Sequence, residues 1–191
     1  TISSKFRFSR YISNNFTSID LVHRNVYEAL HRTNDILKKF MILIDGKKEA
    51  ALLREELKKE VSELKAKYNK VPGLTVILIG DLTPSQIYVR NKEKSANEVG
   101  LKSDVIKYPD SVDEKVVLEK IEELNKDETV SGILVQLPLP KHIDKQKVIE
   151  AIHPSKDVDG FHPMNVGNLS SGYESSVPCT PLGCYLLIKK I

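Results

Sequence analysis

The sequence is poor in aromatic residues, in net charge and in long apolar runs. Its 191 residues contain no Trp, and aromatic residues make up 6% of the chain. The net charge is only +3, and no basic run is interleaved with aromatic residues, which argues against a nucleic-acid-binding protein. No stretch of eighteen apolar residues occurs, so we expect no transmembrane helix and no membrane protein. Apolar residues still make up 40%, which is enough for a hydrophobic core.

Cysteine is also scarce. Cys179 and Cys184 lie five positions apart and have no His or Cys partners at the spacing of a zinc site. We therefore expect no metal site and predict two reduced thiols near the start of a helix. Reduced thiols are typical of a reducing compartment.

Acidic residues are absent from the first nineteen positions, which are rich in Ser, Asn and Thr. Residues 1–40 hold seven basic and three acidic residues, a net charge of +4. This composition is typical of an organelle-targeting presequence and predicts a mitochondrial protein; the alternative is an extension without a targeting role in a cytoplasmic protein. No apolar segment of a secretory signal is present. The globular domain is expected at residues 41–191.

Hydrophobic periodicity in the rest of the chain predicts alternating strands and helices. A stripe from Ala50 to Tyr68 indicates a helix of about 22 residues. Further helices are expected at 85–99, after a capping box formed by Ser111 and Glu114, at 143–152, and from Pro178 onward. Strands are expected at 74–79, 103–108 and 132–135, and the segment after Asp157 is expected to be a loop. This order predicts an α/β fold of three layers, with a parallel β-α-β-α-β-α sheet covered by helices on both faces.

One predicted helix carries polar groups with chemical potential. Tyr88 and Lys92 are four residues apart and share a face, which Ser85 joins. A solvated lysine beside a half-buried tyrosine is the simpler interpretation of such a pair. Short-chain dehydrogenases also use Tyr-x-x-x-Lys, but they need a glycine-rich phosphate turn, and the nine glycines here never form G-x-G-x-x-G.

Two further polar residues follow the buried strand at 132–135. Gln136 stands where the strand ends, and ligands of open α/β sheets bind at the carboxyl ends of strands. Asp159 lies on a turn before Gly160; it could bind a ligand or simply bond local N–H groups. His162 is expected to be structural. Pro138 stiffens the loop after Gln136 and could form a pocket wall.

Four motifs in this order resemble the bifunctional methylenetetrahydrofolate dehydrogenase/cyclohydrolase family. They are Tyr88 to Lys92, Val-Gln-Leu-Pro at 135–138, Lys-Asp-Val-Asp-Gly at 156–160 and Pro-Cys-Thr-Pro at 178–181. The resemblance covers residues 43–191, and Asp-Gly-Phe-His followed by Asn-Val-Gly is similar to the mitochondrial branch.

The resemblance implies a role for each site residue. Tyr88 would stack on the pterin and aminobenzoate portion of tetrahydrofolate, and Lys92 would be the general acid and base beside the one-carbon bridge. Gln136 would hydrogen-bond Lys92, and Asp159 would anchor the pterin amino and ring N–H groups. Ser85 would support the surroundings of Lys92. These residue types suit the roles, because a carboxylate accepts two parallel hydrogen bonds and burial makes it easier for a lysine to lose its proton.

The family also implies NAD or NADP as cofactor and a homodimer. Its nucleotide-binding Rossmann domain is not found in these 191 residues, and Thr180 is the one cofactor-binding residue that the motifs suggest. Two hypotheses follow. The chain is the catalytic domain of an enzyme that oxidises 5,10-methylenetetrahydrofolate and hydrolyses the methenyl product, truncated before its cofactor domain. Alternatively, it is a folate-binding or dimerisation module without turnover.

Overall fold

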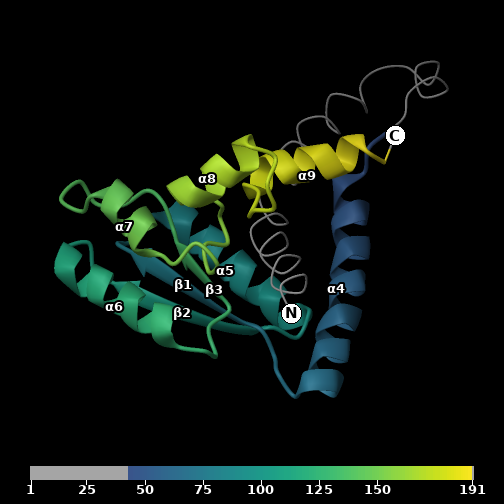
Figure 1. The fold of residues 1–191 in the computed structure, drawn as a ribbon, viewed down its shortest axis with the longest axis horizontal. Helices are drawn as coiled ribbons and strands as arrows, with labels where there is room; N and C mark the ends of the chain where they lie inside the picture. Colours follow the sequence, from purple (N-terminus) through teal and green to yellow (C-terminus); the bar gives the residue numbers. More distant parts are fainter. Residues whose placement is uncertain (1–42, 191) are drawn as a thin grey trace.

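The computed structural model describes residues 43–190, so the prediction for residues 1–40 lies outside the described part. The elements follow in the order α4 (Gly46–Tyr68), β1 (Gly73–Ile79), α5 (Thr83–Glu98), β2 (Lys102–Tyr108), α6 (Glu114–Lys126), β3 (Gly132–Val135), α7 (Lys145–Ala151), α8 (Pro163–Ser170) and α9 (Cys179–Ile188) (Figure 1). The three strands are parallel and lie in the order β2-β1-β3. The predicted α/β fold with helices on both faces of a parallel sheet is thus confirmed.

The central strand β1 divides the core in two, because successive side chains of a strand point to opposite faces. Leu74, Val76 and Leu78 belong to one cluster with residues of α4 and α5, which we call the α4/α5 core. Ile77 and Ile79 belong to the other, the α6/α7 core. All seven residues of β1 are buried, as the continuous apolar run predicts for a strand covered on both sides.

The same alternation governs the edge strand β3. Leu134 belongs to the α4/α5 core, whereas Ile133 and Val135 belong to the α6/α7 core. Helix α6 lays Val117 and Ile121 on that second face, both without any exposed surface. Burying each such side chain stabilises the fold by about 1.5–3 kcal/mol.

Local signals fix the helix ends, and here one prediction is wrong. Ser111 does not cap α6; Asp113 does, and its side chain accepts a hydrogen bond from the Lys115 N–H. Aspartate is as good an N-cap as serine, and Asp113 is adjacent to the first helical residue, where a cap must lie. Asp144, expected inside a helix edge, caps α7 in the same way.

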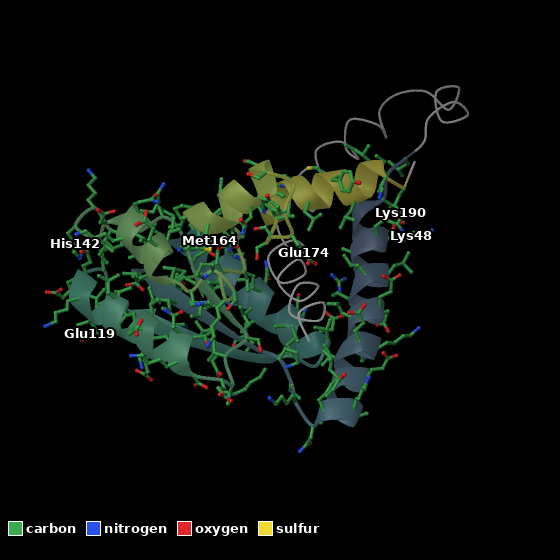
Figure 2. All side chains as sticks on the ribbon, viewed as in Figure 1. Lys48, Glu119, His142, Met164, Glu174 and Lys190 are labelled. Carbon is green, nitrogen blue, oxygen red and sulfur yellow. The ribbon has the colours of Figure 1, made fainter. Side chains whose placement is uncertain are left out.

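The segment after Asp157 contains a helix where only a loop was expected. Helix α8 has eight residues, and His162 caps it through its ring Nδ1, which accepts from the Met164 N–H at 3.1 Å. His162 is therefore structural, as predicted. Helix α9 ends at Ile188, and Lys190 just after it lies near the start of α4 (Figure 2). Lys190 forms an ion pair with Glu49 of α4 at 3.3 Å.

Within residues 43–190, no helix combines the length and apolar character needed to cross a bilayer. Neither cysteine forms a disulfide within these residues, in agreement with the predicted reduced thiols; Cys179 is buried and Cys184 is exposed. The same residues contain no group of His, Cys, Asp or Glu side chains arranged to hold a metal ion.

Candidate functional site

Lys92 and Gln136 meet at the carboxyl end of β3. The Lys92 ammonium nitrogen donates to the Gln136 side-chain oxygen at 3.2 Å, although the two residues are 44 positions apart in the sequence. Gln136 still pairs with β1, since its N–H donates to the Ile77 carbonyl at 2.9 Å. Its side chain therefore points to the same face as Leu134, which is the face covered by α5.

The orientation of the Gln136 amide is fixed by a second bond. Its Nε2 donates to the neighbouring Leu137 carbonyl at 2.8 Å, which leaves Oε1 as the atom that faces Lys92. The contact thus orients the lysine without placing a charge beside it. The next peptide bond, Leu137–Pro138, is cis, and Pro138 is exposed at the rim of the site.

Helix α5 presents three predicted site residues at different depths. Ser85 is buried in its first turn, Lys92 is partly buried, and Tyr88 is 39% exposed. Val89 lies on the buried side and anchors the helix on the sheet. A flat ligand could therefore stack on the open face of Tyr88 while a polar group reaches Lys92.

Asp159 supplies an uncommitted carboxylate near this pair. Within residues 43–190 its carboxyl group makes no hydrogen bond or ion pair, so the alternative of a carboxylate that bonds its own turn does not hold. Burial raises the pKa of Asp159 to about 6; the Lys92 charge works in the opposite direction and the Asp157 charge adds to the increase. An unpaired acid with such a shift is typical of a ligand-binding or catalytic group.

The turn is instead organised by Asp157, which the sequence analysis did not single out. This residue is 3% exposed and accepts hydrogen bonds from the N–H groups of Gly160 and His162. The signal that could have found it is its spacing of three before a glycine, since aspartate commonly bonds backbone groups a few residues ahead.

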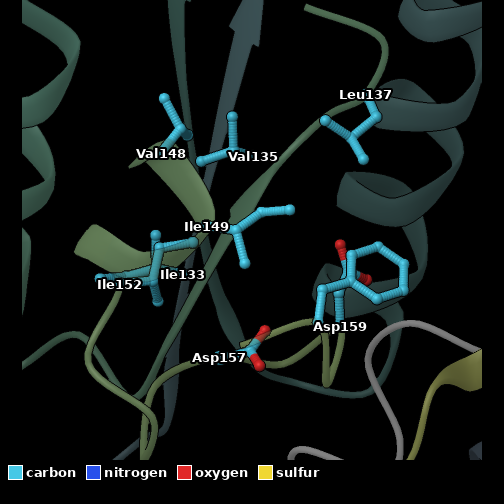
Figure 3. A pocket seen from close by; sticks show the side chains of 9 residues that line it. Ile133, Val135, Leu137, Val148, Ile149, Ile152, Asp157 and Asp159 are labelled. Atoms are coloured by element: carbon cyan, nitrogen blue, oxygen red, sulfur yellow. The ribbon is translucent and has the colours of Figure 1, made fainter. Parts of the chain in front are cut away.

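A small pocket adjoins the two acids. It lies between the end of β3, helix α7 and the Asp157 turn, and Figure 3 shows its apolar lining with both carboxylates at one edge. Its enclosed space of about 10 Å³ is close to what one water molecule needs, so it is no folate-sized cavity. Lys92, Gln136 and Asp159 are each half-buried rather than enclosed in it.

The predicted cofactor residue makes no bond to this group, although the start of α9 contacts the turn at 158–160, where the Cys179 thiol donates to the Val158 carbonyl. Thr180 is exposed in the first turn of α9, and no hydrogen bond joins it to Lys92, Gln136 or Asp159. The N-terminus of α9 has no glycine-rich turn and no side-chain cap. Residues 43–190 therefore do not fit a dinucleotide by themselves.

Comparisons with known proteins identify the family of the chain. The sequence profile of the tetrahydrofolate dehydrogenase/cyclohydrolase catalytic domain matches residues 44–159. The bifunctional protein FolD of Pelagibacter ubique is 83% identical over 151 residues, which cover 79% of this chain and 54% of the relative. FolD of Listeria innocua is 56% identical over 147 residues, or 77% of this chain and 51% of the relative.

Solved structures give the same result. The bifunctional FolD enzyme of Campylobacter jejuni superposes with a TM-score of 0.76 at 48% identity, over 78% of this chain and 53% of that one. A Trypanosoma brucei dehydrogenase-cyclohydrolase, complexed with NADP and an inhibitor, superposes with a TM-score of 0.65 at 39% identity, over 67% and 43%. The chain spans about half the length of the curated relatives it matches. On the profile match and the shared fold, this chain belongs to the tetrahydrofolate dehydrogenase/cyclohydrolase family.

Proposed function

We propose that the protein interconverts one-carbon forms of tetrahydrofolate. It would oxidise 5,10-methylenetetrahydrofolate to 5,10-methenyltetrahydrofolate with NAD or NADP and hydrolyse the product to 10-formyltetrahydrofolate. The observation that carries the proposal is the 3.2 Å bond between Lys92 and Gln136, with the unpaired Asp159 carboxylate beside it. Family membership supports it, because the relatives named above are bifunctional dehydrogenase/cyclohydrolases.

Binding would use the two ends of the site. Asp159 would accept hydrogen bonds from the amino and ring N–H groups of the pterin, an arrangement that is strongest when the carboxyl is ionised. With its pKa raised to about 6, Asp159 is largely ionised at neutral pH and loses this ability as the pH falls through 6. Tyr88 would support the flat ring system with its exposed face, and Ser85 would help to shape the surroundings of Lys92.

The hydrolytic step can be written through this chain's own residues. A water molecule adds its oxygen to the methenyl carbon of the cationic substrate, and Lys92 acts as the general base that takes one proton of that water. The bond from the carbon to N5 then breaks while the remaining hydroxyl proton passes to N5, which leaves the formyl group on N10. One proton is released overall. Gln136 holds the lysine nitrogen in place and adds no charge of its own.

The oxidative step needs a nucleotide, and NAD or NADP would supply the hydride acceptor. Thr180 is the sole residue here that the motifs connect with it. We therefore assign Lys92, Gln136, Tyr88 and Asp159 to substrate positioning and proton transfer. Pro138 would border the bound substrate at the rim of the site.

The test is the decay of methenyltetrahydrofolate, followed by absorbance in protein expressed from its complete reading frame. We expect Lys92→Met to lower the rate by about 10²–10⁴-fold, the usual contribution of a general acid or base. The matched control is Lys94→Met, which removes an exposed lysine from the same helix and should leave the rate unchanged. Equal rates in the parent protein and the Lys92 variant would contradict the proposal. Folate binding without any turnover in the parent would favour the binding module instead.

Two further properties stay predictions. A mitochondrial location is inferred from the composition of residues 1–40, and the alternative is a cytoplasmic protein, as the bacterial FolD relatives of Pelagibacter ubique and Listeria innocua suggest. A fluorescent fusion of these forty residues would test it. The homodimer rests on the family resemblance, and light scattering of the purified protein would measure the mass directly.

A further inference from the structure

The buried carboxylate of Asp157 is saturated with hydrogen bonds. Its Oδ1 accepts from the Gly160 N–H at 3.0 Å, and its Oδ2 accepts from the His162 N–H and the Asn165 side-chain amide, both at 2.9 Å. None of these three donors is a cation, and within residues 43–190 no ion pair reaches Asp157. The negative charge is thus stabilised by N–H groups of its surroundings, and these hydrogen bonds offset the free-energy cost of burying it.

A second layer of bonds makes those surroundings rigid. Asn165 is itself buried, and its side-chain amide also donates to the Pro154 carbonyl at 2.9 Å. Ser175 is buried as well, and its hydroxyl donates to the Asn165 carbonyl at 2.8 Å. The donors to the carboxylate thus lie in the stretch 160–165, and Pro154 and Ser175 hold its last member, Asn165. Asp157 is also tied to the sheet, since it forms a parallel bridge with Ile133 in β3.

This network ends at the peptide next to Asp159. The Gly160 N–H that bonds Asp157 belongs to the peptide unit joining Asp159 to Gly160, so the bond fixes the backbone from which the Asp159 side chain departs. Gly160 has a φ of +68°, a conformation that side chains other than glycine rarely adopt. The hydrogen bond from Gly160 to Asp157 therefore sets the direction in which the Asp159 carboxylate points.

We propose that Asp157 is a positioning residue for the folate reaction, which holds the Asp159 carboxylate at the substrate through the Gly160 peptide and is itself held by Asn165 and Ser175. This inference rests on the proposed function, because it assumes that Asp159 contacts the folate. A structural brace alone could use a neutral acceptor. A negative charge two residues away additionally acts on the ionisation of Asp159, whose other charged neighbour is Lys92 on α5.

The experiment compares Asp157→Asn and Ser175→Ala in protein expressed from its complete reading frame. In Asp157→Asn, one acceptor oxygen becomes an NH₂ group that faces donors, so Asp159 loses its fixed direction. We expect the KM for methenyltetrahydrofolate to rise about ten- to hundredfold, because small misplacements of a binding group are expensive. The acid limb of kcat/KM should also move to lower pH, since the charge that raises the Asp159 pKa is gone.

Ser175→Ala separates positioning from charge. It loosens Asn165 but keeps the Asp157 carboxylate, so the KM should rise several-fold while the acid limb stays in place. The matched control is Asp104→Asn, which removes an exposed carboxylate on β2 and should change neither quantity. If Asp157→Asn fails to fold, the KM of Ser175→Ala decides the matter.

The outcomes separate the two proposals. A parent protein that turns over while the variants keep its KM and its acid limb would overturn the role of Asp157 and leave the proposed function standing. A parent protein without turnover would overturn the proposed function and this inference together. A melting temperature that falls in Ser175→Ala with an unchanged KM would show a purely structural brace, which also overturns the inference.

Discussion

The two faces of the sheet differ in what lies beyond their cores. On the face of the α6/α7 core, the helices turn charged side chains outward, as Glu119 on α6 illustrates (Figure 2). Its surface ion pairs, such as Lys115 with Glu119, contribute less than about 1 kcal/mol each. On the face of the α4/α5 core, the apolar residues give way to Gln136 and Lys92 at the end of β3.

The difference follows from the alternation of side chains along β3. Positions 134 and 136 point to the same face, and the first is apolar while the second is an amide. The Gln136 amide is tolerated where the strand leaves the core because it has a hydrogen-bond partner, which is Lys92. The end of the α4/α5 face therefore carries the Lys92–Gln136 pair, whereas the α6/α7 core is apolar and reaches the site only at its edge, where it lines the pocket beside Asp157 and Asp159.

The sharpest test of this comparison is to open a cavity in the α6/α7 core. Ile121 of α6 has no exposed surface and packs in the α6/α7 core. We expect Ile121→Ala to lower the free energy of unfolding by about 2–5 kcal/mol, the range for truncation of a buried isoleucine. Urea unfolding followed by circular dichroism measures this loss.

The same variant should keep its chemistry wherever it is folded. Its kcat/KM, measured at low temperature and corrected for the folded fraction, is expected to match that of the parent. A selective loss of turnover in a fully folded Ile121→Ala protein would show that the two faces are coupled, and the division drawn above would fail.

Sequence patterns predicted the framework well because burial is periodic. The continuous apolar run of β1 and the stripe along α4 fixed their elements to within a few residues. The pairing of Lys92 with Gln136 came from the family resemblance together with the position of Gln136 at a strand end. Spacing alone could not have shown that a helix residue reaches a strand 44 positions away.

The polar segment after residue 153 resisted prediction for a physical reason. Helix α8 is short and has one buried residue, Asn165, so no apolar stripe marks it. Its structure depends on side-chain bonds to distant backbone groups, which leave no periodic signal. For the same reason Asp157 and Asp159 look equivalent in the sequence, although one is saturated with hydrogen bonds and the other forms none with the residues that the structure describes.

A smaller effect is expected at Gly160, in the turn that carries Asp159. A Cβ on Gly160 would lie 2.9 Å from the Ser176 carbonyl oxygen, and the φ of +68° is unfavourable for alanine. We expect Gly160→Ala to lower the free energy of unfolding by about 2–3 kcal/mol and to lower kcat/KM beyond the loss of folded protein. Chemical unfolding and turnover assays of the same preparation give both values.

Gly172→Ala is the matched control for that substitution. Gly172 has a similar φ of +77°, but nothing lies within 4 Å of its added Cβ. The control should therefore cost about 1 kcal/mol for the backbone conformation alone and leave turnover unchanged. Equal losses in the two variants would show that contact with Ser176 is unimportant and that the turn is not tightly held.

The smallest effect is the dependence of protein stability on the ionisation of Asp159. Burial raises the pKa of Asp159 to about 6, so the folded state binds its proton more tightly than the unfolded state does. This carboxyl therefore lowers the free energy of unfolding as the pH rises from about 4 to about 6. We expect Asp159→Asn to be more stable than the parent by about 1–2 kcal/mol at pH 8, with the difference vanishing below pH 4. Thermal melts across this range measure the difference.

Asp127 at the end of α6 provides a control in which the pKa shift has the opposite direction. Bonds from the Thr129 hydroxyl and N–H lower the pKa of Asp127, so its contribution favours folding above its unfolded pKa and is lost as the pH falls. Asp127→Asn should therefore destabilise the protein slightly at pH 8 and less so in acid. If Asp159→Asn instead destabilised the protein at pH 8, the Asp159 carboxylate would be serving the fold. In that case its lack of hydrogen bonds could no longer be attributed to a place kept for the substrate.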